Sequence, residues 1–421
     1  MIGQGGQGKP TKVLIIGINY RPELTAVGPY TAGIAEALAQ RGDRVTVLTG
    51  LPHYPAWRIA AGTSRRLFSS TEVDGVQVLR AAHYVPSRQS ALRRGAYEGT
   101  FLVSGVAALL RAALLRELEW PDAILGIVPS LSGGVLARAV GTGLHVRYGL
   151  LFQDLMGRAA AQSGIPGGGS VARITSTLEA WAAGRATVVG VVSEAFLPTL
   201  IEMGVAPSRM RSVPNWVRLA EPTLSTAETR RRFGWSDGRQ VVLHAGNMGH
   251  KQGLEQVIAA ARLAAERGDP VRFILAGGGN QEEALRALGA DLPTLEFLGV
   301  QPDGLHASLL AAADVLLLSE RATQLDMSLP SKLTSYLAAG RPIVAAVPSG
   351  GASAREIERS QAGLLVPAGE AAAILAALTR LRSEPVLAAE LAAAGPAYSA
   401  IHLSAAAGLA RAVAFVDEIA A

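Results

Sequence analysis

The sequence predicts an α/β protein made of two doubly wound domains that face each other across a cleft. Its 421 residues are too many for one ordinary hydrophobic core. Short apolar runs alternate with segments of helical spacing, which is the pattern of parallel strands joined by helices. The alternation stops at a polar stretch, residues 221–228, and then begins again. We therefore expect one sheet on each side of that stretch.

The first half predicts a series of buried parallel strands. Residues 12–18 (KVLIIGI) are apolar after the first position, and a helical segment at 30–40 separates them from the next strand, RVTVLT. This β–α–β opening favours a doubly wound sheet. Further strands are predicted at residues 44–49, 76–80, 123–127, 145–152 and 187–192, and further helices at 97–118, 131–140 and 174–183.

The strand at 145–152 delivers Gln153 and Asp154 to its carboxyl end. Ligands of open α/β sheets bind at this edge, which makes Asp154 a candidate for chemistry. The alternative is an aspartate that only caps its own loop.

The second half repeats the pattern. Strands are predicted at residues 240–244, 271–276, 295–298, 315–318, 343–347 and 363–366, and helices at 254–266, from 281 and at 305–312. We place the boundary within 211–217, so the domains span 12–215 and 216–400. Residues 401–421 are expected to form a helix that packs back toward the first domain, and residues 1–11 a disordered tail without the apolar core of a signal peptide.

Composition and charge exclude several classes of protein. Apolar residues make up 49% and charged residues 17%, which indicates a folded chain. The absence of cysteine excludes a disulfide scaffold, a thiolate metal site and a cysteine nucleophile, and it fits a cytoplasmic protein. No apolar run approaches the length of a membrane span, since 101–110 has only ten residues.

The charge differs between the two halves. Residues 1–215 carry a net charge of +8 and residues 216–421 a net charge of −3. The basic half could face an anionic membrane surface or an anionic acceptor, or simply reflect a drift toward arginine. Nucleic acid is not an expected partner, because aromatic residues are 5% and no basic stripe is interleaved with them.

A loop, a helix and a strand follow one another in residues 326–347, DMSLPSKLTSYLAAGRPIVAAV. Pro330 suits the first helical turn, and Gly340 with Pro342 ends the helix. Ser331 and Lys332 would then lie at a helix N-terminus, where free N–H groups and the helix dipole favour a phosphate. An ordinary capped helix with a surface lysine explains the same pattern.

Other polar and glycine-rich positions give weaker signals. Neither half has a G-x-G-x-x-G motif after its first strand, and the triplet at 277–279 is most simply a tight turn. His53 and His83 are expected to be surface or loop histidines. His244 lies within an apolar strand and is expected in the core.

Taken together, the motifs resemble the glycosyltransferase 4 family, from about residue 12 to the end. AGNMGHKQGLEQVI is similar to the family's diphosphate loop, ILAGGGNQEEALRAL to its second strand–helix unit, LEFLGVQPDGL to the loop whose backbone reads the base, and LPSKLTSYLAAGRPIVAA to its donor helix. INYRPELTAVGPYTAGIAEALAQRGDRVTVLTGLPHYP, LFQDL and VPNWV look closest to the colanic-acid biosynthesis branch. The resemblance implies the GT-B fold, with two Rossmann-like domains.

The sequence departs from the family pattern at two places. The usual pair of glutamates, with seven residues between them, falls at Met327 and Ser335, so that Asp326 or the Ser335 hydroxyl would have to replace a carboxylate. Asn247 stands where the family often has arginine. Gln252 takes the usual place of a lysine, and Lys251 comes one residue earlier.

The resemblance also implies a reaction: transfer of a sugar from a UDP- or GDP-sugar to a hydroxyl of a glycan or lipid-linked acceptor, with retention and without metal or cofactor. Lys251 and Lys332 would neutralise the diphosphate, Asp154 would orient or deprotonate the acceptor, and Gly28 would let the donor phosphate approach from across the cleft. The implied donor contacts are Gly246, Asn247, Gln252, Gly277, Val300, Asp326, Pro330, Ser331 and Ser335.

Two other functions stay open. A nucleotide-sugar epimerase of the same fold would need several acids and a histidine in the cleft, and carboxylates are scarce in residues 326–335. A non-catalytic nucleotide-sugar binder fits the missing glutamate pair.

A final expectation concerns the membrane. Arginines flank an aromatic loop with Tyr54 and Trp57, whose rings could lie at headgroup level. We expect reversible contact with the anionic cytoplasmic leaflet, against the alternative of a solvated loop. The arginines are Arg58, Arg65, Arg66, Arg88, Arg93 and Arg94.

Overall fold

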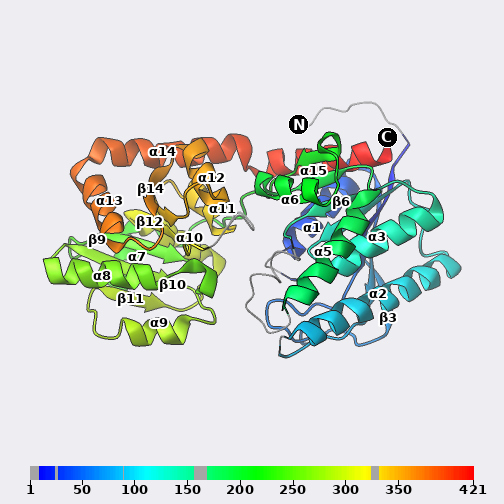
Figure 1. The fold of residues 1–421 in the computed structure, drawn as a ribbon, viewed down its shortest axis with the longest axis horizontal. Coiled ribbons are helices and arrows are strands. Elements are labelled where there is room, and N and C mark those ends of the chain that lie inside the picture. The colour runs from blue at the N-terminus through cyan, green and yellow to red at the C-terminus, as the bar shows by residue number, and fades with distance from the viewer. Residues whose placement is uncertain (1–8, 24–26, 89, 156–167, 324–330) are drawn as a thin grey trace. The chain divides into compact units, whose positions relative to one another are not determined.

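The computed structural model describes residues 9–23, 27–88, 90–155, 168–323 and 331–421, and the chain divides into two compact units. The first unit holds residues 1–215 with 408–421, and the second holds 216–407. Each is an open, mainly parallel sheet with helices against it (Figure 1), so the predicted doubly wound α/β class is confirmed.

The sheet of the first unit has the strand order β3-β4-β2-β1-β5-β6-β7-β8. Chain order reverses between the two central strands, and Val13 in the first strand pairs with both Val45 and Ala123. The carboxyl ends of these central strands mark the edge where such sheets bind ligands. The parallel strands are β1 (Lys12–Ile16), β2 (Arg44–Thr49), β4 (Val76–Ala81), β5 (Ala123–Val128), β6 (Tyr148–Phe152), β7 (Val189–Val191) and β8 (Met210–Ser212).

Strand β3 (Phe68–Val73) is antiparallel to β4 and is missing from the predicted strands. Its sequence FSSTEV is mostly exposed and lacks the apolar character of the other strands. The turn that joins β3 to β4 holds Asp74 and Gly75 with φ of 52° and 76°. An Asp-Gly pair is a strong hairpin signal because both positions accept positive φ.

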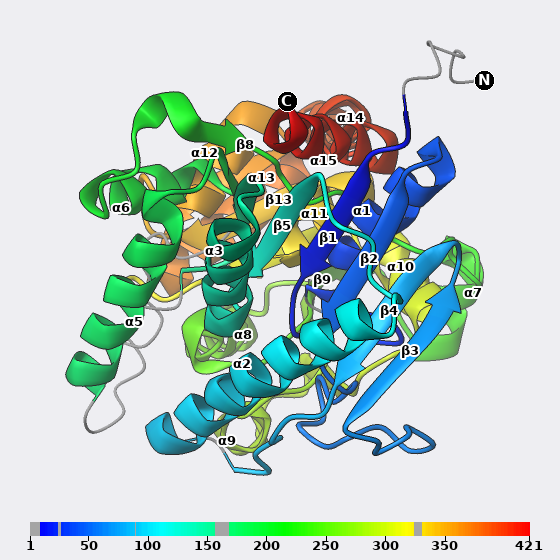
Figure 2. The same ribbon diagram turned by 90° about the vertical axis from the view of Figure 1, so that its right-hand side faces the viewer.

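The helices of the first unit are α1 (Gly28–Arg41), α2 (Ala91–Leu114), α3 (Leu131–Leu144), α5 (Gly168–Gly184) and α6 (Leu197–Glu202), with short turns η1 (Glu194–Phe196) and η2 (Pro207–Arg209). Helices α2, α3 and α5 lie together on one face of the sheet (Figure 2). Helix α2 begins six residues before the predicted start, because the Ser90 hydroxyl caps it by accepting from the Arg93 N–H.

The last helix, α15 (Ala405–Ala420), packs against β6 and β7. A side chain at Gly149 would place its Cβ 2.5 Å from Ile419, and one at Gly190 would place it 3.1 Å from Phe415. Both glycines therefore make room for this helix. Arg41 also pairs with Asp417 at 2.8 Å, which joins α15 to the end of α1.

The second unit has a six-stranded parallel sheet in the order β11-β10-β9-β12-β13-β14. These strands agree with the predicted ones to within a residue. They are β9 (Gln240–Ala245), β10 (Val271–Ala276), β11 (Leu295–Leu298), β12 (Val315–Ser319), β13 (Ile343–Val347) and β14 (Gly363–Pro367).

Alternate side chains of this sheet enter two apolar layers. One layer holds Val242 and Leu317 with α8 and α13, and the other holds Leu243 and Leu318 with α10, α11 and α12. The helices and turns are α7 (Thr226–Phe233), η3 (His250–Gln252), α8 (Glu255–Arg267), α9 (Glu282–Leu288), α10 (Asp303–Ala312), α11 (Ser331–Ala338), α12 (Ala352–Ser360), α13 (Ala371–Ser383) and α14 (Pro385–His402).

Helix α7 begins inside the polar stretch at 221–228, which is predicted only as a connection, and continues to Phe233. Ser225 and Glu228 form a capping box at its start, in which each side chain bonds the other residue's backbone N–H. This Ser-x-x-Glu spacing is the signal that identifies such a helix.

The expectation that no segment approaches a membrane span is too strict. Leu92–Leu114 and Pro385–Ala420 are long and apolar enough to cross a membrane, and about a third of the apolar stretch is buried in each. Counting only an uninterrupted apolar run hides these helices because isolated charges interrupt them. Core helices of soluble proteins have the same length and composition.

Candidate active site

Two glycine turns lie against each other at the carboxyl edge of the second unit's sheet. Gly277, directly after β10, has φ of 133°, and a Cβ there would lie only 1.9 Å from the Gly246 carbonyl oxygen. A Cβ on Gly279 would lie 2.5 Å from the Met248 oxygen. The triplet at 277–279 is therefore more than a tight turn, since it supports the loop that follows β9.

Lys332 reaches this loop from the first turn of α11. Gly246 has φ of 143°, and a Cβ there would lie 3.1 Å from Cε of Lys332. Glycine at position 246 thus leaves space for the lysine side chain.

The amino group of Lys332 contacts two side chains. Its Nζ donates to Oε1 of Gln252 at 2.5 Å and lies 3.2 Å from Nε2 of His244. His244 is fully buried at the end of β9, as expected for a core residue, but its contact with Lys332 was not predicted. The structure therefore joins residues from β9, η3 and α11 around one cation.

Burial lowers the pKa of Lys332 from 10.5 to about 7, and the nearby Glu320 carboxylate opposes this shift. Glu320 follows β12, is 8% exposed, and accepts a hydrogen bond from the Ser353 hydroxyl at 2.7 Å. This carboxylate is not among the predicted site residues. Its position directly after a buried strand was the available signal.

Other predicted donor residues have less defined surroundings. Asn247 and Lys251 are exposed on the loop between β9 and α8, and the Lys251 carbonyl accepts from Arg321 N–H. Val300 is 80% exposed after β11, and Ser335 is half-buried one turn beyond Lys332. Ser331 begins α11, whereas Asp326 and Pro330 lie outside the described residues.

In the first unit, the predicted acceptor and phosphate residues follow separate strands. Asp154 is half-buried after β6, and its Oδ1 accepts from the N–H of Leu155 at 2.8 Å. Gly28 is the first residue of α1, and a Cβ there would lie 3.3 Å from Cβ of Glu23. The local bond of Asp154 is compatible with a loop-capping role.

His53 and His83 lie in loops, which is one of the two predicted settings, but they are buried and not at the surface, since they are only 2% and 8% exposed. They lie at the carboxyl edge, after β2 and β4. Nε2 of His53 lies 2.9 Å from the Tyr97 hydroxyl, and Oε1 of Glu23 accepts from the His53 N–H at 2.8 Å. Burial lowers the pKa of His83 to about 4.

Trp57 belongs to the same aromatic cluster. It is half-buried with φ of 50°, its ring lies 5.5 Å from that of Tyr97, and the Arg94 guanidinium lies 4.8 Å above it. Arg94 therefore stacks on an aromatic ring, whereas Arg58, Arg65, Arg66, Arg88 and Arg93 are exposed.

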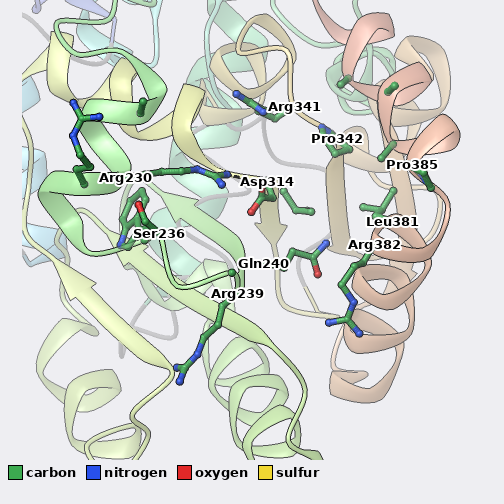
Figure 3. Close-up of a pocket in the computed structure, with 18 residues that line it drawn as sticks. Arg230, Ser236, Arg239, Gln240, Asp314, Arg341, Pro342, Leu381, Arg382 and Pro385 are labelled. Carbon is green, nitrogen blue, oxygen red and sulfur yellow. Dashed lines mark hydrogen bonds and ion pairs between the residues drawn. The ribbon is translucent and has the colours of Figure 1, made fainter.

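A cavity of about 830 Å³ lies at the opposite edge of the second sheet, where its strands begin (Figure 3). Arg230 donates to the Ala312 carbonyl at 2.9 Å and pairs with Asp314, and Arg341 donates to the Ala311 carbonyl. These cations satisfy the C-terminal carbonyls of α10. We therefore place the site at the other edge, where the lysine lies.

Two open, mainly parallel α/β units, one with a half-buried lysine at the carboxyl edge of its sheet, define the class as a protein of the two-domain GT-B fold. The family model "Glycosyl transferase 4-like domain" matches residues 25–216, and "Glycosyl transferases group 1" matches 239–384. The colanic acid biosynthesis glycosyl transferase WcaI of Escherichia coli is 33% identical over 340 residues, which are 78% of this chain and 81% of that protein. The chain therefore belongs to the glycosyltransferase 4 family, as the sequence motifs predict.

Solved structures agree with this fold. Sucrose-phosphate synthase from Thermosynechococcus elongatus superposes with a TM-score of 0.73 at 16% identity, covering 95% of this chain and 96% of that one. HepE of Anabaena in complex with UDP-glucose gives a TM-score of 0.67 at 16% identity, covering 96% and 99% of the two chains.

Proposed function

We propose that this glycosyltransferase moves a hexosyl group from a nucleoside diphosphate sugar to a hydroxyl of a glycan or lipid-linked acceptor, with retention and without a metal. The pathway we infer is exopolysaccharide or other cell-surface glycan biosynthesis, which is the role in the name of the E. coli relative. The observation that carries the proposal is the Lys332 amino group, held at the carboxyl edge beside a glycine turn.

The chemistry requires neutralisation of a diphosphate leaving group. A positive charge fixed before the reaction stabilises the charge that develops on the leaving phosphate. Two hydrogen-bond acceptors hold Lys332 at the N-terminus of α11, and the first N–H groups of a helix, which have no partner within the helix, favour an anion. Lys251, Asn247 and the amides of the β9–α8 loop supply further donors. Gly246, Gln252, Gly277, Val300, Ser331 and Ser335 complete the donor site, with Asp326 and Pro330 in the segment that precedes α11.

The first unit supplies the acceptor site in this proposal. Asp154 orients or deprotonates the acceptor hydroxyl, and Gly28 admits the donor phosphate. A UDP-sugar is a candidate donor because HepE, a protein of the same fold, has been solved with UDP-glucose. A GDP-sugar is the second candidate.

One experiment tests the activity directly. The protein is incubated with UDP-glucose and with GDP-mannose, with and without a lipid extract as acceptor, and release of UDP or GDP is measured. Release that depends on the acceptor supports transfer. Tight donor binding without release supports the second candidate, a non-catalytic nucleotide-sugar binder, which the local bond of Asp154 and the missing glutamate pair favour.

We also propose that the enzyme works in the cytoplasm, in reversible contact with an anionic membrane. Five exposed apolar residues of α2 fall within about 80° on one side of the helix, given 3.6 residues per turn. They are Leu92, Val103, Val106, Leu110 and Leu114, with exposed fractions of 85%, 71%, 42%, 61% and 83%. Exposed Arg88 and Arg93 lie at the N-terminal end of this stripe, where they can attract anionic headgroups.

A further inference from the structure

The orientation of the His244 ring follows from its partners. Nδ1 lies 3.1 Å from the Leu317 carbonyl oxygen in the neighbouring strand β12. A carbonyl can only accept a hydrogen bond, so Nδ1 carries the proton and Nε2 of the neutral ring is an acceptor. Burial, followed by the nearby Lys332, lowers the pKa of His244 well below its usual value, against opposing contributions from the backbone of Leu317 and Asn247, and this keeps the ring neutral.

The lone pair on Nε2 of His244 faces the amino group of Lys332. Nε2 lies 3.2 Å from Nζ of Lys332, which also donates to Gln252. An ammonium group has three N–H donors, so these two acceptors fix its direction and leave one donor for a ligand. Because a buried ring nitrogen needs a hydrogen-bond partner, the Lys332 amino group also satisfies Nε2 of His244.

The position of His244 makes the contact rigid. The ring stands on β9, inside the sheet, and is held by β12, so it cannot follow a displaced lysine. In the described part of the chain, the titratable groups that act on the Lys332 amino group are His244 from β9 and Glu320 after β12.

We propose that His244 is a positioning residue, whose imidazole holds the Lys332 amino group in the place where it meets the donor diphosphate. This inference rests on the proposed function for the phosphate contact, but the hold itself is a property of the ligand-free protein. Removing the acceptor would allow the lysine to turn away, and it would also disfavour the charged form of the amine, because a charge-assisted hydrogen bond is lost.

The first test needs no ligand. The chain has four lysines, Lys9, Lys12, Lys251 and Lys332, so NMR of protein labelled with ¹³C at lysine Cε gives a simple spectrum. Lys332→Arg identifies the resonance by its loss. We expect the Lys332 midpoint near pH 7 in the wild type, lower by about one pH unit in His244→Leu, and close to the wild type in His244→Gln, whose amide oxygen can replace Nε2.

Tyr336→Phe is the matched structural control. Tyr336 is buried, its hydroxyl bonds the backbone of Ala245 beside His244, and it lies on the same helix as Lys332. This variant perturbs the same end of β9 without removing the acceptor. An equal shift in Tyr336→Phe and His244→Leu, or no shift in His244→Leu, would overturn the positioning role.

The second test measures UDP-glucose binding by calorimetry at about pH 6 and about pH 8.5. Each phosphate of this probe carries one ester link, one anhydride link and a single acidic oxygen that is already ionised, so neither titrates in this range. We expect about tenfold weaker binding in His244→Leu, with a larger loss at the higher pH, and recovery in His244→Gln. If the lysine midpoint shifts but no form of the protein binds the probe, the proposed UDP donor is wrong and the positioning role is retained. Unchanged affinity in His244→Leu would refute the phosphate contact.

Discussion

The Lys332 amino group lies 2.5 Å from the side-chain oxygen of Gln252, eighty residues earlier in the chain. The motif resemblance places Gln252 where relatives have a lysine. The structure therefore brings a cation to this place from another element, the first turn of α11. A loop lysine and a helix lysine can meet the same phosphate because the loops after parallel strands gather at one edge of the sheet.

Replacing Lys332 by alanine should reduce turnover on the order of a hundredfold at saturating donor, by analogy with removal of one oxyanion donor. We expect a similar loss from Lys251→Ala, although Lys251 is exposed. Steady-state kinetics with the donor identified by the release assay measure both. Near-wild-type turnover in both variants would mean that the phosphate cradle lies elsewhere.

The strands of the second unit were predictable because each is a short, mainly apolar run ended by glycine, proline or a polar residue. The contact between His244 and Lys332 was not predictable. A single histidine in an apolar run gives the same sequence pattern whether or not its ring has a polar partner. The burial of His53 was also hidden, since the sequence around it is rich in proline and aromatic residues and resembles a surface loop. Contacts between residues far apart in the sequence determine both the partner of His244 and the burial of His53, and a local sequence pattern carries no information about such contacts.

Activity should persist in EDTA. No Asp-x-Asp motif occurs in the sequence, so no obvious carboxylate pair is available to hold a divalent ion on the diphosphate. Product release is measured after dialysis against EDTA and after addition of manganese or magnesium. A strict loss in EDTA that manganese restores would contradict the lysine-based mechanism.

Lys332→Met should stabilise the ligand-free protein while it weakens donor binding. The pKa of Lys332 falls to about 7 in the folded protein, so between pH 7 and 10.5 the unfolded chain binds more protons and the free energy of unfolding rises with pH. The cost of the buried charge is therefore complete below pH 7 and disappears toward pH 10.5. We expect the melting temperature of Lys332→Met to exceed that of the wild type by about 3 °C at pH 6.5, and by less at pH 9.5. A constant difference across this range would contradict the low pKa.

His83→Gln should make stability less sensitive to acid. Burial lowers the pKa of His83 from 6.5 to about 4, and His53 acts in the same direction. Between these values the unfolded chain binds more protons, so stability is lost as the pH falls from 6.5 toward 4. The loss from this one residue at pH 5 is about 2 kcal/mol. Thermal unfolding at pH 7 and pH 5 should show a smaller difference for His83→Gln than for the wild type, while the contribution of His244 is common to both.

Vesicle binding tests the contact with a membrane. Each arginine near an anionic leaflet contributes roughly 1 kcal/mol, and this attraction falls off within a Debye length. Arg94 is stacked on Trp57 and is left unchanged. The variant replaces four exposed arginines, Arg65, Arg66, Arg88 and Arg93, by glutamine. We expect co-sedimentation with phosphatidylglycerol vesicles to weaken in this variant and to lose much of its salt dependence. The control with the same change in charge replaces four exposed arginines of the second unit, Arg231, Arg232, Arg267 and Arg382.

The stripe on α2 makes a separate contribution in the same assay. Apolar burial does not depend on salt, so Leu92→Ser combined with Leu110→Ser should weaken binding at every salt concentration and leave the salt dependence unchanged. Both side chains are more than half exposed, so the change should cost little stability. The arginines act through charge and the leucines through burial. If α2 and its basic end touch the bilayer together, the arginine variant should lose salt dependence and the leucine variant should lose affinity at every salt concentration. Equal binding to neutral vesicles, or none to anionic vesicles at low salt, would refute the membrane contact.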